Sequence, residues 1–111
     1  MGYDEELAGR IRDLLADEPG VKEQKMFGGL AFLIGGHMAV AASGQGGLLV
    51  RSDPEESHQL VATTKAQLME MRGREMAGWL RVASEDVETR PELAEWVEIG
   101  RSYARSLPPK R

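Results

Sequence analysis

The side chains that could perform catalysis or bind a metal are few, and they lie far apart along the 111-residue chain. There is no cysteine, which excludes a thiol nucleophile, a thiolate metal site and a disulfide. The two histidines, His37 and His58, lack the neighbours of a Ser-His-acid triad or of an H-x-x-x-H zinc motif. We therefore predict no catalytic residue and no metal ligand.

Glycine clusters and paired carboxylates can be explained without a cofactor. The chain has no Gly-Lys pair for a Walker loop, and the glycines at 44–47 lie between two predicted strands, where a dinucleotide loop does not occur. The carboxylates at 53–56 and 85–88 stand at predicted helix starts, where negative charge favours the helix dipole. We expect turns and helix caps from these segments, no cofactor and no enzymatic activity.

Charge and hydropathy limit the functional classes further. The net charge of −4, from 14 basic and 18 acidic residues, argues against a dedicated nucleic-acid binder, which usually carries a basic surface. No apolar run approaches the ~20 residues of a membrane span. The N-terminus is acidic, whereas a signal peptide begins with basic residues. We predict a cytoplasmic protein without a membrane segment, folded as a single domain over residues 1–111.

Three segments have the spacing and end signals of helices. Residues 3–16 place four aliphatic side chains on one stripe. A second helix is predicted from the Asp53 cap to about residue 62, and a third from the Thr89 cap to residue 107, each with proline in its first turn. Gly100 lies on the apolar stripe of the third helix, which indicates close packing against a strand or a partner helix.

The remaining apolar segments are short and separated by glycine, which is typical of antiparallel strands. Gly35-Gly36 is a two-residue hairpin signal, and Gly73 supplies a later turn. Gly78, inside the last apolar segment, indicates a bulge or a close approach of another backbone. The predicted strands are residues 22–26 (an edge strand), 30–34, 37–43, 47–51, 67–71 and 75–82.

The resulting order, α-β(3-4)-α-β(2)-α, indicates an α+β fold with an antiparallel sheet and helices packed on one face. We expect the core to contain Leu7, Ile11, Phe32, Val40, Leu49, Leu80, Trp96 and Tyr103. The second sheet face is also apolar, since strand alternation places on it Ala39, Ala41, Leu49, Ala77 and Trp79. A homodimer that pairs these second faces would remove them from water.

Five of the six methionines fall in predicted strands or at their edges, and these are Met26, Met38, Met69, Met71 and Met76. Methionine fills irregular cores, and it also forms adaptable binding surfaces because its thioether chain is flexible and polarizable. The pattern fits either a core or a sheet that binds another protein.

Two blocks of the sequence are similar to a known bacterial family. Residues 26–33 (MFGGLAFL) and 73–79 (GREMAGW), together with 38–40 and 48–51, resemble the N-terminal domain of TfoX (Sxy), a competence regulator. The resemblance implies a secretion-chaperone-like fold, transcriptional regulation through protein partners, and no catalytic residues to carry over. TfoX-type regulators have a second, helical domain, so we expect this chain to be a stand-alone copy of the first.

These observations favour a non-enzymatic regulatory or protein-interaction module whose protein partner is unknown. We expect its ligand or partner surface to include Phe27, Phe32, Trp79, Arg72 and Arg74. The alternative is a small-ligand-binding protein or minor enzyme, with a pocket between the sheet and the last helix lined by both phenylalanines, Trp79 and Trp96. Nucleic-acid binding through the arginines is a third interpretation, against which the acidic net charge argues.

Overall fold

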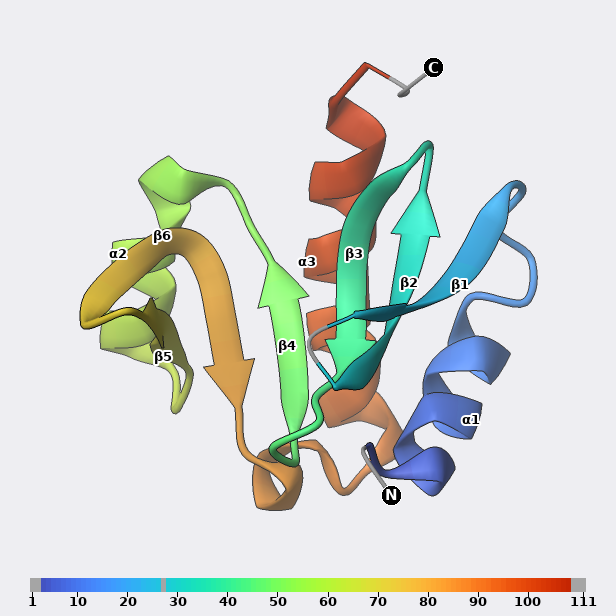
Figure 1. Cartoon of the computed structure of the whole chain (residues 1–111), viewed down its shortest axis with the longest axis horizontal. Helices are drawn as coiled ribbons and strands as arrows, with labels where there is room; N and C mark the ends of the chain where they lie inside the picture. Colours follow the sequence, from blue (N-terminus) through green and yellow to red (C-terminus); the bar gives the residue numbers. More distant parts are fainter. Residues whose placement is uncertain (1–2, 27, 109–111) are drawn as a thin grey trace.

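The computed structural model describes residues 3–26 and 28–108, and it confirms the predicted order of helices and strands, with four strands in the first group (Figure 1). The elements are α1 (Glu5–Leu14), β1 (Val21–Met26), β2 (Gly29–Ile34), β3 (His37–Ala42), β4 (Leu48–Arg51), α2 (Pro54–Thr63), β5 (Gln67–Met71), β6 (Arg74–Val82), the 3-10 helix η1 (Ser84–Val87) and α3 (Arg90–Ser106).

The strands form one antiparallel sheet in the order β1-β2-β3-β4-β6-β5. The first four strands follow one another as a meander. β6 then lies next to β4, and β5 takes the outer edge, because α2 carries the chain past the position of β6 (Figure 1). The β4–β6 pairing runs from Leu48 with Val82 to Arg51 with Trp79. β1, at the other edge, is largely exposed, as its charged residues predict.

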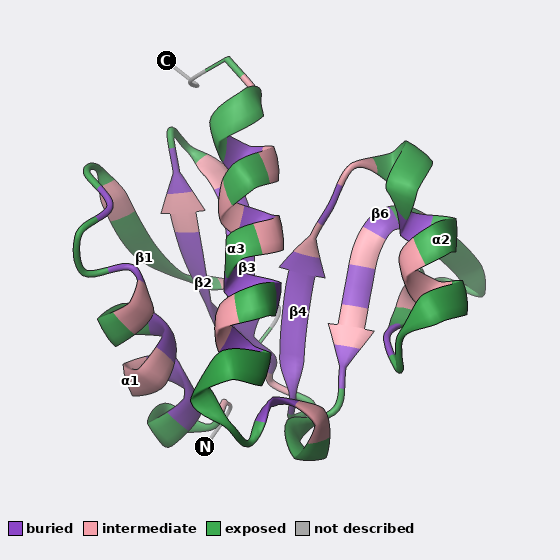
Figure 2. Cartoon of the chain, turned by 180° about the vertical axis from the view of Figure 1, so that it is seen from behind, coloured by how far each residue is buried: buried purple, intermediate pink, exposed green. Residues whose placement is uncertain are grey.

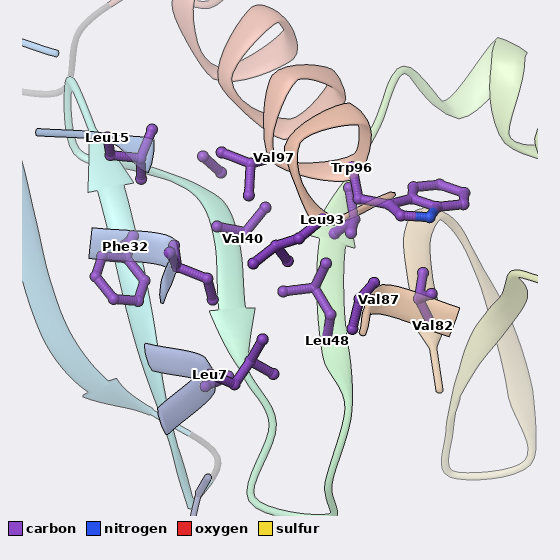
Figure 3. Packing of buried hydrophobic residues seen from close by; sticks show 14 of the residues in the cluster. Leu7, Leu15, Phe32, Val40, Leu48, Val82, Val87, Leu93, Trp96 and Val97 are labelled. Carbon is purple, nitrogen blue, oxygen red and sulfur yellow. The ribbon is translucent and has the colours of Figure 1, made fainter. Parts of the chain in front are cut away.

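All three α-helices pack on one face of the sheet (Figure 2), as predicted for this α+β fold. Their apolar residues form one hydrophobic cluster with the inward side chains of the strands. Figure 3 shows Leu93 and Val97 of α3 directed toward Val40 of β3 and Leu48 of β4. None of the described helices is both long enough and apolar enough to cross a membrane.

The helices begin where their capping side chains lie. The Asp4 carboxylate accepts hydrogen bonds from the N–H groups of Glu6 and Leu7 at 2.9 and 3.2 Å, so α1 begins at Glu5. Asp53 caps α2 in the same way. Thr89 and Glu92 form a reciprocal capping box at the start of α3. The predicted Asp53 and Thr89 caps are therefore confirmed, whereas the Asp4 cap was not predicted from the sequence.

The predicted core is confirmed at every position except Tyr103. The residues Leu7, Ile11, Phe32, Val40, Leu49, Leu80 and Trp96 are buried. The prediction for Tyr103 was wrong: this residue is only half-buried, since its ring stacks near the guanidinium of Arg51, whose Cζ lies 5.0 Å from the ring centroid. Leu49 is buried on the opposite side of the sheet from the others.

A β-bulge in β3 changes which side chains face the helices. Phe32 pairs with Val40 while Leu33 pairs with Met38, so Ala39 is an extra residue in β3. Ala39 and Val40 are therefore both buried on the helix side, and Met38 lies on the other face. Placing Ala39 on the second face by simple alternation was wrong for this reason.

Candidate protein-interaction surface

The sheet face without helices carries a second hydrophobic cluster, which we call the uncovered cluster. Its four central side chains are buried, and four larger side chains around them are partly exposed. The central residues are Ala31, Met38, Ala41 and Leu49, and the surrounding ones are Met26, Leu33, Met69 and Trp79. Figure 1 shows this face in front, with α3 behind β3 and with β1 crossing in front of β2 and β3.

A small cavity lies within the uncovered cluster. Met26, Met38 and Met69 line it from three strands, and Arg81 and the loop after β3 complete its wall. Its volume is about 50 Å³. A pocket for a metabolite usually measures about 300–1,000 Å³, whereas a water molecule needs only about 15 Å³ on the same scale. The cavity can hold a few waters, and the face suits contact with another surface better than enclosure of a ligand.

Two arginines border the uncovered cluster. The Arg51 Cζ lies 4.5 Å from the Trp79 ring centroid, and Arg51 Nη1 donates a hydrogen bond to the Gly78 carbonyl at 3.1 Å. Arg81 Nη2 donates to Ser43 Oγ at 3.2 Å. The cation–π contact supports the indole at the margin of the face. Sequence reasoning did not single out Arg51, because its position opposite Trp79 depends on the β4–β6 pairing.

The sequence of this chain matches the model of a known protein family. The sequence matches the family model of the TfoX N-terminal domain over residues 13–104, from α1 into α3. This chain belongs to the TfoX N-terminal domain family. No curated protein sequence matches it. The resemblance inferred from the two sequence blocks is thereby confirmed, and the matched range of the TfoX N-terminal domain includes the whole sheet.

Glycines in the two blocks of this TfoX N-terminal domain have structural roles. A Cβ at Gly29 would lie 2.3 Å from the Ala42 carbonyl oxygen, so β2 and β3 approach each other closely at this point. Gly78 has φ +86, and a Cβ there would lie 2.9 Å from the Ser52 carbonyl oxygen. The sequence predicted a bulge or a close backbone approach at Gly78. The Ser52 contact shows the close approach, and the bulge is also present, because β6 residues 77–79 are skipped in the pairing with β5.

The structure separates the residues predicted to form one surface. Trp79 belongs to the uncovered cluster, and Arg72 and Arg74 are exposed at the β5–β6 turn. Phe32 faces the helices and is fully buried, which corrects its assignment to a partner surface. Phe27 lies outside the described residues.

The predicted pocket between the sheet and the last helix is not formed by the side chains assigned to it. Phe32 lies inside the helix-side core, Trp79 is on the opposite face of the sheet, and Trp96 belongs to α3. The helix side does carry a groove beside Trp96, but neither Phe32 nor Trp79 lines it.

The histidines stay apart in the fold. His37 Nε2 donates a hydrogen bond to the Pro108 carbonyl at 2.6 Å, which ties the end of α3 to the β2–β3 hairpin. His58 is exposed on α2. Within residues 3–26 and 28–108, no group of three or more His, Cys, Asp or Glu side chains could hold a metal ion.

Proposed function

We propose that this TfoX N-terminal domain is a non-enzymatic regulatory module that acts by binding protein in the bacterial cytoplasm. The observation that carries the proposal is the uncovered cluster, an apolar sheet face over which no described helix packs. An antiparallel sheet usually has one polar, solvated face. A second apolar face is a feature of sheets that are covered by a partner.

The side chains at the border of the uncovered cluster suit an adaptable contact. Met26 and Met69 are partly exposed there, and Met71, further along β5, is 36% exposed. Flexible thioether chains can repack against more than one partner shape. Trp79 adds a large, rigid ring of the kind that dominates binding energy in protein interfaces.

The partner we propose for this face is a second copy of the chain. Two copies related by a twofold axis would bring the same residues together from both sides. A standard interface of about 800 Å² per partner would cover the face. The acidic net charge and the small cavity support protein over nucleic acid or a metabolite as the bound species.

Sedimentation at micromolar concentration tests this function. The wild-type chain is expected to sediment as a dimer, and Trp79→Glu as a monomer with unchanged far-UV circular dichroism. Trp79→Phe, which keeps an apolar ring, should remain dimeric. Met71→Glu adds a charge at a side chain that is already exposed, so it should weaken the dimer without risk to folding. A wild-type chain that sediments only as a monomer would contradict the dimer.

A further inference from the structure

The helix side of the sheet carries a groove between α2 and α3, which we call the α2–α3 groove. Two cavities, of about 460 and 340 Å³, lie along it and share Ile99. One is lined by the end of α2 and the start of α3, the other by the start of α2 and the end of α3. The two helices therefore run antiparallel along the groove. Figure 2 shows β4 and β6 between their ribbons.

The floor of the α2–α3 groove is apolar. Leu60 from α2 lines it together with Trp96 and Ile99 from α3 and with Val82 of β6. Figure 3 shows the Trp96 indole extending from α3 toward the β6 side. Leu60 and Ile99 are only half-buried, so part of this apolar strip faces solvent along the helices.

The rim of the α2–α3 groove is strongly acidic. Six carboxylates line it, and Lys65, whose Nζ lies 3.6 Å from an Asp86 oxygen, is the single base among the described lining residues. The six are Asp53, Glu56, Asp86, Glu92, Glu95 and Glu98. The net charge of the whole chain is −4, so the acidic excess of the molecule is concentrated at this groove.

Some of these carboxylates already have partners, and two do not. Asp53 and Glu92 cap their helices, and Glu98 accepts hydrogen bonds from Arg101 and Ser102. Among the described contacts, no base pairs with Glu56 on α2 or with Glu95 on α3. One uncompensated carboxylate thus stands on each wall of the groove.

We propose that the α2–α3 groove binds a basic amphipathic helix of a partner protein. An apolar strip between two helices accepts the apolar face of a third helix, as in other helix-in-groove complexes. Lysine or arginine residues flanking that apolar face would meet the carboxylates on both walls. The ten residues of α2 give the groove a length of about 15 Å, enough for three turns of a bound helix.

This surface is distinct from the uncovered cluster, because the two lie on opposite faces of the sheet. A chain that does not dimerise could still bind a helix in the groove, and a chain that binds no helix could still dimerise.

A designed peptide tests the proposal. The probe is a Leu/Lys helix of about 14 residues with leucines on one face, and its twin replaces every lysine by glutamate. In a Trp79→Phe variant the remaining tryptophan, Trp96, reports on the groove by fluorescence. The Leu/Lys peptide is expected to shift the Trp96 emission and to move amide resonances of α2 and α3. The Leu/Glu twin is expected to leave both unchanged.

Matched variants separate the groove from general charge attraction. Glu56→Gln with Glu95→Gln removes one carboxylate from each wall and should weaken Leu/Lys binding about fivefold to twentyfold. Glu5→Gln with Glu6→Gln removes the same charge from the exposed first turn of α1 and should change binding less than about twofold. The proposal would be overturned if both pairs of substitutions weakened Leu/Lys peptide binding equally. It would also be overturned if the peptide moved only amide resonances of the strands, or if it did not bind.

Discussion

Gly100 of α3 lies directly against the backbone of Ala39 in β3. A Cβ at Gly100 would lie 2.2 Å from the Ala39 carbonyl oxygen and 2.9 Å from a Val40 methyl carbon. The β3 bulge brings the Ala39 carbonyl to this point, and the missing side chain lets the helix axis approach the sheet. The close packing predicted from a glycine in the apolar stripe is confirmed.

Gly100→Ala should destabilise the fold strongly, because the new methyl group would meet backbone atoms that cannot rotate away. We expect a loss of about 3 kcal/mol or more in the free energy of unfolding, measured by urea denaturation. Gly9→Ala in α1 is the matched control, since a Cβ there meets nothing within 4 Å. That variant should be neutral or up to about 1 kcal/mol more stable, as alanine favours helix. A neutral Gly100→Ala would contradict the contact.

Phe32→Ala should cost about 3–5 kcal/mol of stability, because the ring is 0% exposed and its removal leaves a cavity under α1. Phe32→Leu keeps most of the volume and should cost less than about 2 kcal/mol. Thermal unfolding of both variants gives the comparison. Equal losses would show that the site collapses around smaller side chains.

Glu18 joins the segment after α1 to the last turn of α3. Its side chain is 3% exposed, and its two carboxylate oxygens accept hydrogen bonds from Arg105 Nη2 and Nε at 2.5 and 3.1 Å. Glu18→Ala should lower the free energy of unfolding by about 1 kcal/mol or more. Asp17→Ala, at a side chain that is 90% exposed, should change it by less than about 0.5 kcal/mol. Similar effects of the two substitutions would contradict this role of Glu18.

Acid should destabilise the domain through three glutamates. The pKa of Glu23 is lowered by its hydrogen bond with Arg12, that of Glu92 by the backbone N–H of Thr89, and that of Glu98 by Arg101. A carboxylate with a lowered pKa stabilises the fold above its unfolded value of 4.5, and this stabilisation is lost as pH falls through the folded value. The free energy of unfolding should therefore decrease as the pH is lowered below about 4.5.

The Glu98→Gln variant checks the acid prediction. Denaturant unfolding between about pH 6 and pH 3 should show a smaller acid-dependent loss in this variant than in the wild type. Glu5→Gln, at an exposed residue of α1, should keep the wild-type pH dependence. If the free energy of unfolding depended on pH in the same way in the wild type and in both variants, a role for Glu98 in acid unfolding would be contradicted.

Local signals predicted most of the fold. The Asp53-Pro54 start of α2 and the Gly35-Gly36 hairpin appear where the sequence indicates them, because caps and tight turns depend on a few neighbouring residues. The position of Gly78 alone predicted a bulge or a close approach of another backbone, and the structure shows both.

Features set by distant partners could not be predicted in the same way. The extra residue at Ala39 has no local signature, so alternation placed it on the wrong face. The insertion of β6 between β4 and β5 decides that Arg51 lies opposite Trp79. The α2–α3 groove depends on the spacing of two helices. Asp53, Glu56 and Asp86 were interpreted only as helix-start residues, and the sequence did not single out Glu95 or Glu98 of α3.

The crossover through α2 divides the sheet into two units, each built from elements that are close in the sequence. Strands β1 to β4 pair with sequence neighbours, and α3 packs on β3 and β4, whereas α2, β5 and β6 form a second local group. Within the sheet, the units meet along the four residue pairs between β4 and β6. Amide hydrogens of β5 and β6 should therefore exchange with solvent by local opening before those of β2 and β3 do. A helix bound in the α2–α3 groove would touch both units and slow that opening.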